Sequence, residues 1–199
     1  MNIVEPIRDL RKIEAMKSVL AAGQMGERNV VLFSLGINTA YRISDLRQLR
    51  LQDVLTVSKR RVVVKERLDL KEQKTGKHNS IILSRRLRTQ LRTYVEEEFP
   101  DYLRNQDFEH YLFPSRDGQD QPLTREHLSR MLSTAGRAVG LAHIGAHSMR
   151  KTFGYHLYAQ GTPIELIQTL LNHSSARETL RYIGITQQQK DTAVMSLDL

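Results

Sequence analysis

The sequence is organised around the run His147-Ser148-Met149-Arg150-Lys151-Thr152-Phe153. His147 and Arg150 are three positions apart, so on a helix their side chains share a face and can reach one point. An arginine presents planar donors that match phosphate oxygens and keeps its charge at physiological pH. A histidine takes up or releases a proton near neutrality. The pair alone is common on solvated helix faces, so its meaning depends on the rest of the chain.

The composition narrows the class of protein. A chain of 199 residues is long enough for one well-cored domain. Its formal net charge of +8 favours an anionic partner, with nucleic acid first and an anionic membrane surface second. A charge that only keeps the surface soluble is the alternative. The chain has no cysteine, which excludes a disulfide framework, a thiolate metal site and a cysteine nucleophile.

Hydrophobic spacing predicts a mainly α fold. Helical periodicity predicts helices over residues 9–23, 27–36, 84–98, 124–140, 147–160, 162–171 and 175–184, with a short helix near Tyr41. The expected N-caps are Asp9, Ser84, Thr124, Thr162 and Ser175, and Pro163 is expected at the first helical position after Thr162. The runs 61–65 and 80–83 are β-branched or apolar, and residues 73–77 are typical of a turn. We therefore expect an α+β domain in which one small antiparallel β-sheet with a basic hairpin tip packs on helices.

Residues able to handle a phosphate follow one another along the chain. Arg42 comes first, followed at i+3 by Asp45, which could hold its guanidinium or start a helix-surface pair. Lys74-Thr75-Gly76 lies on the predicted turn, and the His147–Arg150 run comes next. His173 and Tyr182 complete the series, nine residues apart.

This order strongly resembles the catalytic domain of the tyrosine recombinase (phage integrase) family, over residues 7–186. In that family an arginine, a lysine on a β-hairpin, a His-x-x-Arg box, a Gly-His pair and a nucleophilic tyrosine occur in sequence. The resemblance implies the tyrosine recombinase catalytic-domain fold. It also implies a site-specific DNA recombinase or integrase that cleaves and rejoins DNA strands through a 3′-phosphotyrosyl intermediate, with no metal or other cofactor.

The resemblance assigns a catalytic set consisting of Arg42, Lys74, His147, Arg150, His173 and Tyr182. Tyr182 would attack the scissile phosphate, and the two arginines would hold its non-bridging oxygens. Lys74 would protonate the leaving 5′-oxygen, with Lys77 as its rival on the same turn. His147 would help to remove the tyrosine proton, and His173 would hydrogen-bond the phosphate. Asp45 would support Arg42 without touching the substrate.

Three positions depart from the family pattern. Ala40 and Asn172 stand where glycine is usual, and Lys151 stands where histidine is common. None of these changes removes a reacting group, so we expect them to affect geometry and rate.

The resemblance implies double-stranded DNA as the partner, with a homotetramer assembled on recombination sites, and no membrane. Candidate DNA contacts outside the catalytic set are basic residues that could instead simply solvate the surface: Lys59, Arg60, Lys77, Arg85, Arg86 and Arg125. We expect a cytoplasmic protein of bacterial or phage origin, because no apolar run approaches the roughly 20 residues of a membrane helix.

Residues 1–199 are expected to form a single catalytic domain without the N-terminal core-binding domain of most family members. The tail, residues 187–199, is expected to pack on the domain or to be exchanged between subunits. Two other functions remain open at this point. A DNA-binding accessory or regulatory module would use the same positive charge without cutting, and a type IB topoisomerase would share the phosphotyrosine chemistry.

Overall fold

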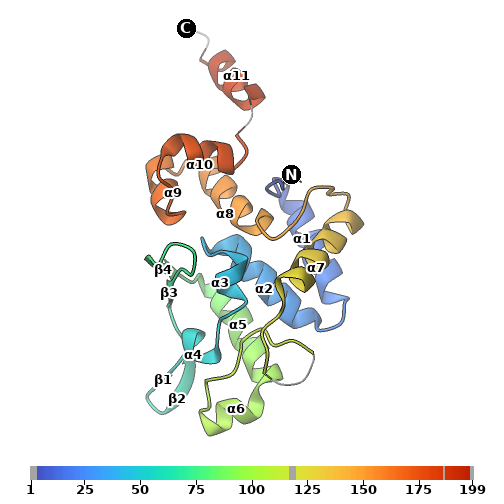
Figure 1. Ribbon diagram of the computed structural model, residues 1–199, viewed down its shortest axis with the longest axis vertical. Helices are drawn as coiled ribbons and strands as arrows, with labels where there is room; N and C mark the ends of the chain where they lie inside the picture. Colours follow the sequence, from blue (N-terminus) through green and yellow to red (C-terminus); the bar gives the residue numbers. More distant parts are fainter. Residues whose placement is uncertain (1–3, 117–119, 186, 198–199) are drawn as a thin grey trace.

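Helix α2 (Gly26–Asn38) runs through the middle of the computed structural model, which describes residues 4–116, 120–185 and 187–197 (Figure 1). Its residues from Arg28 to Gly36 are all buried, because the helix is apolar nearly all round. It packs against α1 (Leu10–Ala21), α5 (Arg85–Glu98) and α8 (Ser148–Ala159). Helix α2 is therefore the element on which the other long helices are assembled.

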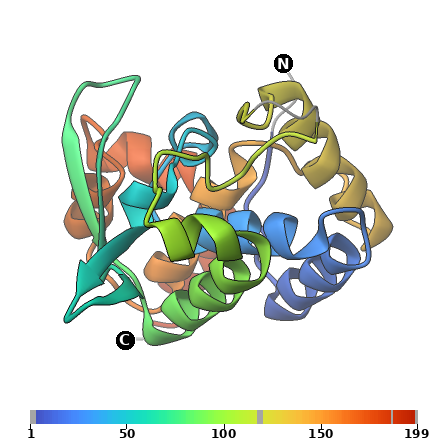
Figure 2. The ribbon, with the colours of Figure 1, turned by 90° about the horizontal axis from the view of Figure 1, so that it is seen from below.

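The remaining helices are shorter or more peripheral. They are α3 (Ile43–Leu46), α4 (Leu51–Val54), α6 (Pro100–Asn105), α7 (Arg125–Ala138), α9 (Ile164–Leu170), α10 (Ala176–Tyr182) and α11 (Gln187–Met195). Seen from below, β-hairpins lie on one side of the helical body, and α1 and α7 lie on the other (Figure 2). The predicted mainly α fold with a small antiparallel β component is confirmed. Within the described residues, no helix has the length and apolarity required to cross a membrane.

Four of the five predicted N-caps are confirmed. The fifth is wrong, because Pro163 and not Thr162 holds the N-cap position of α9, which therefore begins later than predicted. The side chains of Asp9, Ser84, Thr124 and Ser175 each accept a hydrogen bond from a backbone N–H in the first turn of the following helix, at 2.8, 3.2, 3.1 and 3.1 Å. These bonds satisfy donors that the helix itself leaves unpaired.

The strands form two separate hairpins where one sheet was predicted. Strand β1 (Leu55–Ser58) pairs with β2 (Arg61–Val64), and β3 (Arg67–Lys71) pairs with β4 (His78–Ile82). The expectation that the runs 61–65 and 80–83 form one sheet is therefore wrong. Polar and apolar residues alternate along β1 and β3, so neither strand contains an apolar run that would predict it. The turn between β1 and β2 places Lys59 and Arg60 at φ of 48° and 63°, a geometry that Asn-Gly usually signals.

Two glycines let α8 come close to its neighbours. A Cβ on Gly36 of α2 would overlap the side chain of Met149. A Cβ on Gly154 of α8 would lie 2.7 Å from Ile183, the residue after α10. Helix α8 is thus held between the end of α2, which leads to Arg42, and the end of α10, which carries Tyr182.

Candidate active site

Arg150 lies at the centre of the predicted site. It sits in the first turn of α8, and its side chain is 3% exposed. One terminal nitrogen donates to the carbonyl of Ala40, and the other donates to the carbonyl of Leu171 at 2.5 Å. Burial and the charge of Arg42 lower the pKa of Arg150, but a guanidinium remains charged. Arg150 therefore ties the segment after α2 to the end of α9, and its own orientation is fixed.

Arg42 occupies the N-cap position of α3, and its guanidinium forms an ion pair with Glu72. Asp45 supports Arg42 through the backbone, and not by holding the guanidinium. The Asp45 carboxylate accepts instead from the backbone N–H of Arg42 at 3.2 Å and from that of Gln73 at 3.0 Å. The i+3 spacing makes Asp45 the reciprocal capping residue of α3. Asp45 thus fixes the backbone that carries Arg42 and the base of the β3–β4 turn.

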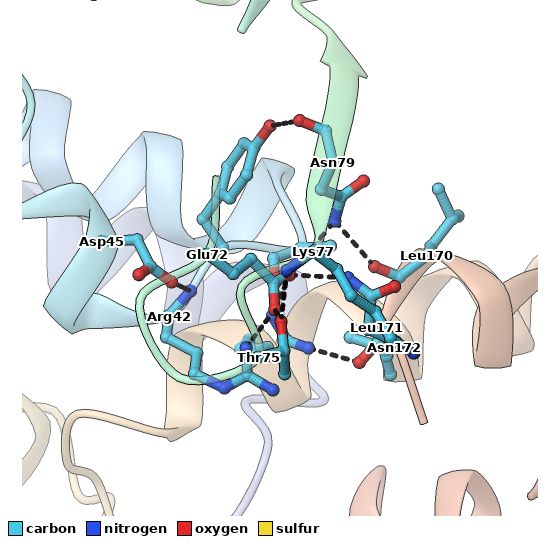
Figure 3. Close-up of polar contacts among 12 residues, drawn as sticks. Arg42, Asp45, Glu72, Thr75, Lys77, Asn79, Leu170, Leu171 and Asn172 are labelled. Carbon is cyan, nitrogen blue, oxygen red and sulfur yellow. Dashed lines mark hydrogen bonds and ion pairs between the residues drawn. The ribbon is translucent and has the colours of Figure 1, made fainter. Parts of the chain in front are cut away.

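Glu72 is the residue that the sequence analysis missed. Its side chain is fully buried, and it accepts hydrogen bonds from Arg42, Thr75, Asn79 and Asn172 (Figure 3). It also lies 3.8 Å from a terminal nitrogen of Arg150. In the sequence it stands in a polar turn segment, which is typical of a solvated charge. Its burial comes from groups supplied by distant segments, and no local pattern reports these.

Tyr182 is the last residue of α10 and is half-buried next to the arginines. Its ring meets the ring of His173 edge to face, with centroids 4.9 Å apart. The ammonium of Lys151 lies 5.3 Å from the Tyr182 centroid and donates to the carbonyl of Val4 at 2.8 Å. Burial raises the pKa of Tyr182, while the charges of Arg150 and Arg42 and a hydrogen bond from Arg150 act to lower it. The phenol is therefore protonated near neutral pH.

His173 is held by the segment that carries Tyr182. Its Nδ1 lies 3.1 Å from the hydroxyl of Thr179 on α10. The preceding residue, Asn172, has φ of 49°, in the left-handed region that glycine adopts freely and asparagine tolerates. The change from the family's glycine to Asn172 therefore preserves the backbone path. Burial lowers the pKa of His173, so the ring is neutral at pH 7.

His147 lies at the N-cap position of α8, one turn before Arg150. Partial burial of the ring, followed by the charges of Arg125, Lys151, Arg150 and Arg42, lowers the pKa of His147. A histidine with a lowered pKa is neutral at pH 7, which is the form that can accept a proton.

We expect the imidazole C–H resonances of His147 to titrate with a midpoint below 6.5 in an NMR pH series on the DNA-free protein. Arg125→Ala should raise this midpoint, because it removes a positive charge that disfavours the imidazolium. Arg60→Ala is the control, since Arg60 lies on the β1–β2 turn and its charge is not among those that act on His147. A midpoint at or above 6.5, or no response to Arg125→Ala, would contradict the electrostatic account.

Lys74 and Lys77 lie on the turn between β3 and β4, and both side chains are exposed. The turn is closed by hydrogen bonds from Gly76 N–H to the Glu72 carbonyl and from Glu72 N–H to the Lys77 carbonyl, at 2.8 and 2.9 Å. In the part of the chain that the structure describes, neither ammonium forms a hydrogen bond or ion pair that would fix it toward the site. The structure brings the base of this turn to the site, and the choice between the two lysines stays a prediction.

The other predicted DNA contacts are exposed but scattered. Lys59 and Arg60 form the β1–β2 turn, Arg85 and Arg86 open α5, and Arg125 opens α7. Arg125 lies near enough to His147 to lower its pKa, whereas Arg86 acts on Glu14 of α1. Of these residues, Arg125 is thus placed at the edge of the site. Among the described residues, no group of three or more His, Asp or Glu side chains is placed to hold a metal ion.

Comparison with known proteins identifies relatives of the chain. The phage integrase family matches residues 9–189. The probable integrase/recombinase YoeC of Bacillus subtilis is 38% identical over 187 residues, which cover 94% of this chain and 93% of that protein. Tyrosine recombinase XerA of Pyrococcus furiosus is 27% identical, and the match covers 94% of this chain but 60% of that protein.

Solved structures share the fold. XerH site-specific recombinase, bound to a palindromic difH substrate in a post-cleavage complex, gives a TM-score of 0.73 at 20% identity, covering 98% of this chain and 53% of that chain. XerA recombinase gives a TM-score of 0.69 at 19% identity, covering 98% of this chain and 65% of that chain. The chain therefore spans little more than half to about two thirds of these larger proteins, but nearly all of YoeC.

Proposed function

We propose that the chain, which belongs to the phage integrase family, cleaves and rejoins double-stranded DNA at specific sites through Tyr182. Its relatives include proteins named tyrosine recombinases. The observation that carries the proposal is the convergence of four groups from separate segments. The charge of Arg150 acts on Tyr182, Tyr182 packs on His173, and Arg42 is joined to Arg150 through Glu72. A phenol beside two guanidiniums and neutral histidines is suited to attack on a phosphodiester.

In the proposed reaction the Tyr182 oxygen forms a bond to the scissile phosphorus while the bond from phosphorus to the 5′-oxygen breaks. His147 takes the phenol proton, which is needed because burial keeps the phenol protonated. Lys74 gives a proton to the departing 5′-oxygen. Attack by a 5′-hydroxyl on the phosphotyrosine reverses these steps and rejoins a strand. One phosphodiester replaces another, so no nucleotide is hydrolysed.

The two arginines would bind the non-bridging oxygens and stabilise the charge that grows on them. The charge of Arg150 already acts on the Tyr182 phenol in the DNA-free protein and favours its ionised form. The phosphate clamp and the nucleophile thus share one guanidinium, and this would place the phenol oxygen beside any phosphate that Arg150 binds. The same charges would act where other phosphoryl-transfer enzymes use metal ions.

The test is covalent capture on nicked duplexes that tile the DNA on both sides of the protein's own gene. A nick beside the cleaved bond lets the short 5′-hydroxyl fragment diffuse away, so the protein remains attached. We expect a denaturant-resistant protein–DNA adduct on a duplex that contains the recognised site. Binding without an adduct on every duplex would favour a non-cutting module, and relaxation of supercoiled plasmids that lack the site would favour a topoisomerase.

We extend the proposal to assembly. The tail helix α11 lies beyond α10 at the far end of the molecule (Figure 1). Val194, Met195 and Leu197 are 71, 79 and 64% exposed there, and residues 198 and 199 of the predicted tail lie outside the described residues. Such apolar side chains are stabilised when another surface covers them. The proposed cover is a neighbouring copy within a homotetramer on DNA.

Deleting residues 187–199 should leave the melting temperature within a few degrees, because the exposed tail adds little to the core. It should reduce the fraction of protein in multimeric complexes on DNA, measured by light scattering after size-exclusion chromatography. The triple change Val194→Ser, Met195→Ser and Leu197→Ser should act in the same direction. Unchanged assembly by both variants would refute the exchange of the tail.

A further inference from the structure

Glu72 is a carboxylate with no access to solvent, placed between two guanidiniums. Burying an ion without partners is strongly unfavourable, so such a group persists only when its neighbours satisfy it. Oε2 accepts from Arg42 and from Thr75 at 3.0 Å, and Oε1 accepts from Asn172 at 2.9 Å and Asn79 at 3.3 Å. The carboxylate is therefore fully engaged by donors from three segments: Arg42 before α3, Thr75 and Asn79 of the β3–β4 hairpin, and Asn172 after α9 (Figure 3).

We propose that Glu72 is a positioning residue that holds Arg42 and Arg150 in their phosphate-binding arrangement before DNA is bound. The inference rests on the proposed function, because it assumes that these two arginines bind the scissile phosphate. Glu72 itself would not touch the substrate.

Charge explains why the arginines need such a residue. The charge of Arg42 already disfavours the charged form of Arg150 in this buried setting. A negative charge between the two compensates for their repulsion, which is strong where water is excluded. Burial alone would raise the pKa of Glu72, but hydrogen bonds from Asn172 and Arg42 and the charges of both arginines hold it below its ordinary value. Glu72 is thus ionised at neutral pH, as the role requires.

The two asparagines explain how Arg150 stays available. They occupy Oε1, so Arg150 is held at 3.8 Å by charge, and its terminal nitrogens donate to the backbone carbonyls of Ala40 and Leu171. Asn79 also donates to the Leu170 carbonyl at 3.2 Å, which ties β4 to α9. Asn172 combines a left-handed backbone with an amide donor. The family's usual glycine supplies the backbone geometry alone.

Glu72 also fixes the turn that carries Lys74. Its backbone N–H and carbonyl close the turn, and its side chain accepts from Thr75 in the same turn. One residue therefore sets the position of the turn base relative to the arginines. A defect at Glu72 must be separated from a defect that acts only through the lysine.

The test compares Glu72→Gln with Glu66→Gln. Both changes remove one negative charge, but the Glu66 side chain is 80% exposed and pairs with Arg88 at the other end of β3. Cleavage is measured under single-turnover conditions at saturating protein on a nicked duplex. We expect Glu72→Gln to slow cleavage about 10- to 100-fold, the factor for one charge-assisted hydrogen bond. DNA affinity should change by less than this factor, and Glu66→Gln should match wild type. Asn172→Gly should also slow cleavage, by a smaller factor than Glu72→Gln does.

A substrate with sulfur in place of the 5′-bridging oxygen separates the two routes, because a thiolate leaves without needing a proton. On this substrate the cleavage rate of Lys74→Ala should return to that of wild type, whereas Glu72→Gln should still cleave slowly. Full restoration of Glu72→Gln would mean that Glu72 acts through the lysine, and it would overturn the inference. Cleavage by Glu72→Gln at the wild-type rate would overturn it as well.

A second readout does not depend on cleavage. Nε–H and Nη–H signals of the two arginines are followed by NMR in ¹⁵N-arginine-labelled, DNA-free protein, with assignment by Arg42→Lys and Arg150→Lys. We expect Glu72→Gln to shift both sets and to speed their exchange with water, while Glu66→Gln leaves them in place. Unchanged signals in folded Glu72→Gln would overturn the inference. If wild type forms no adduct, the proposed function fails and these spectra alone decide whether Glu72 holds the arginines.

Discussion

Replacing Tyr182 by phenylalanine should abolish covalent attachment to DNA and leave the fold intact. The phenyl ring keeps the edge-to-face contact with His173 and the contact with Lys151, and only the attacking oxygen is lost. Removing a nucleophile costs about 10⁴-fold or more in rate. We expect no adduct on a denaturing gel, with DNA binding preserved in a native gel. Stability should fall by no more than about 1 kcal/mol, because one hydroxyl is lost and the ring keeps its packing.

The matched control is Tyr158→Phe. Tyr158 lies in the last turn of α8 with 38% of its surface exposed, and the same hydroxyl is removed there. This variant should form adduct at the wild-type rate. An adduct formed by Tyr182→Phe would show that another group attacks the phosphate.

Replacing Arg150 by lysine should reduce both cleavage and stability. A lysine keeps the charge but cannot reproduce the planar fork that reaches the carbonyls of Ala40 and Leu171 together. We expect the single-turnover cleavage rate to fall about 10²- to 10³-fold, which is the range for removing one hydrogen-bond donor that stabilises the charge of the transition state. The free energy of unfolding in urea should fall by about 2–4 kcal/mol, because buried acceptors lose a charged donor.

Arg181→Lys is the corresponding control, since Arg181 is exposed on α10 next to Tyr182. It should match wild type in cleavage and unfolding. Wild-type cleavage by Arg150→Lys would remove Arg150 from the proposed clamp. A loss of cleavage in the control as large as in Arg150→Lys would point to a general sensitivity of this region to the substitution.

Much of the fold could be predicted from the sequence because its signals are local. Helix periodicity and the caps at Asp9, Ser84, Thr124 and Ser175 depend on residues within a turn of each other. The candidate site could be assembled from the order of Arg42, His147, Arg150, His173 and Tyr182, although these residues are far apart in the chain. That inference came from resemblance to a family, and the structure adds the ring contact of Tyr182 with His173 and the effect of the Arg150 charge on the Tyr182 phenol.

The features that were missed depend on distant partners or on weak local patterns. Glu72 is buried only because Arg42, Asn79 and Asn172 surround it. Asp45 could hold either a guanidinium or a backbone N–H, and only the placement of Glu72 decides between them. Two separate hairpins form where one sheet was expected, because short strands with alternating polar residues do not specify their pairing partners. The packing of the helices decides which strands pair.

The most direct measurement of the central claim is mass spectrometry of the adduct that wild-type protein forms on a nicked duplex. Nuclease and trypsin digestion should leave a nucleotide joined through its 3′-phosphate to the peptide that begins at Tyr182, after cleavage at Arg181. The account predicts that fragmentation places this added mass on the Tyr182 side chain. A nucleotide on any other residue, or an adduct whose Tyr182 peptide is entirely unmodified, would contradict it.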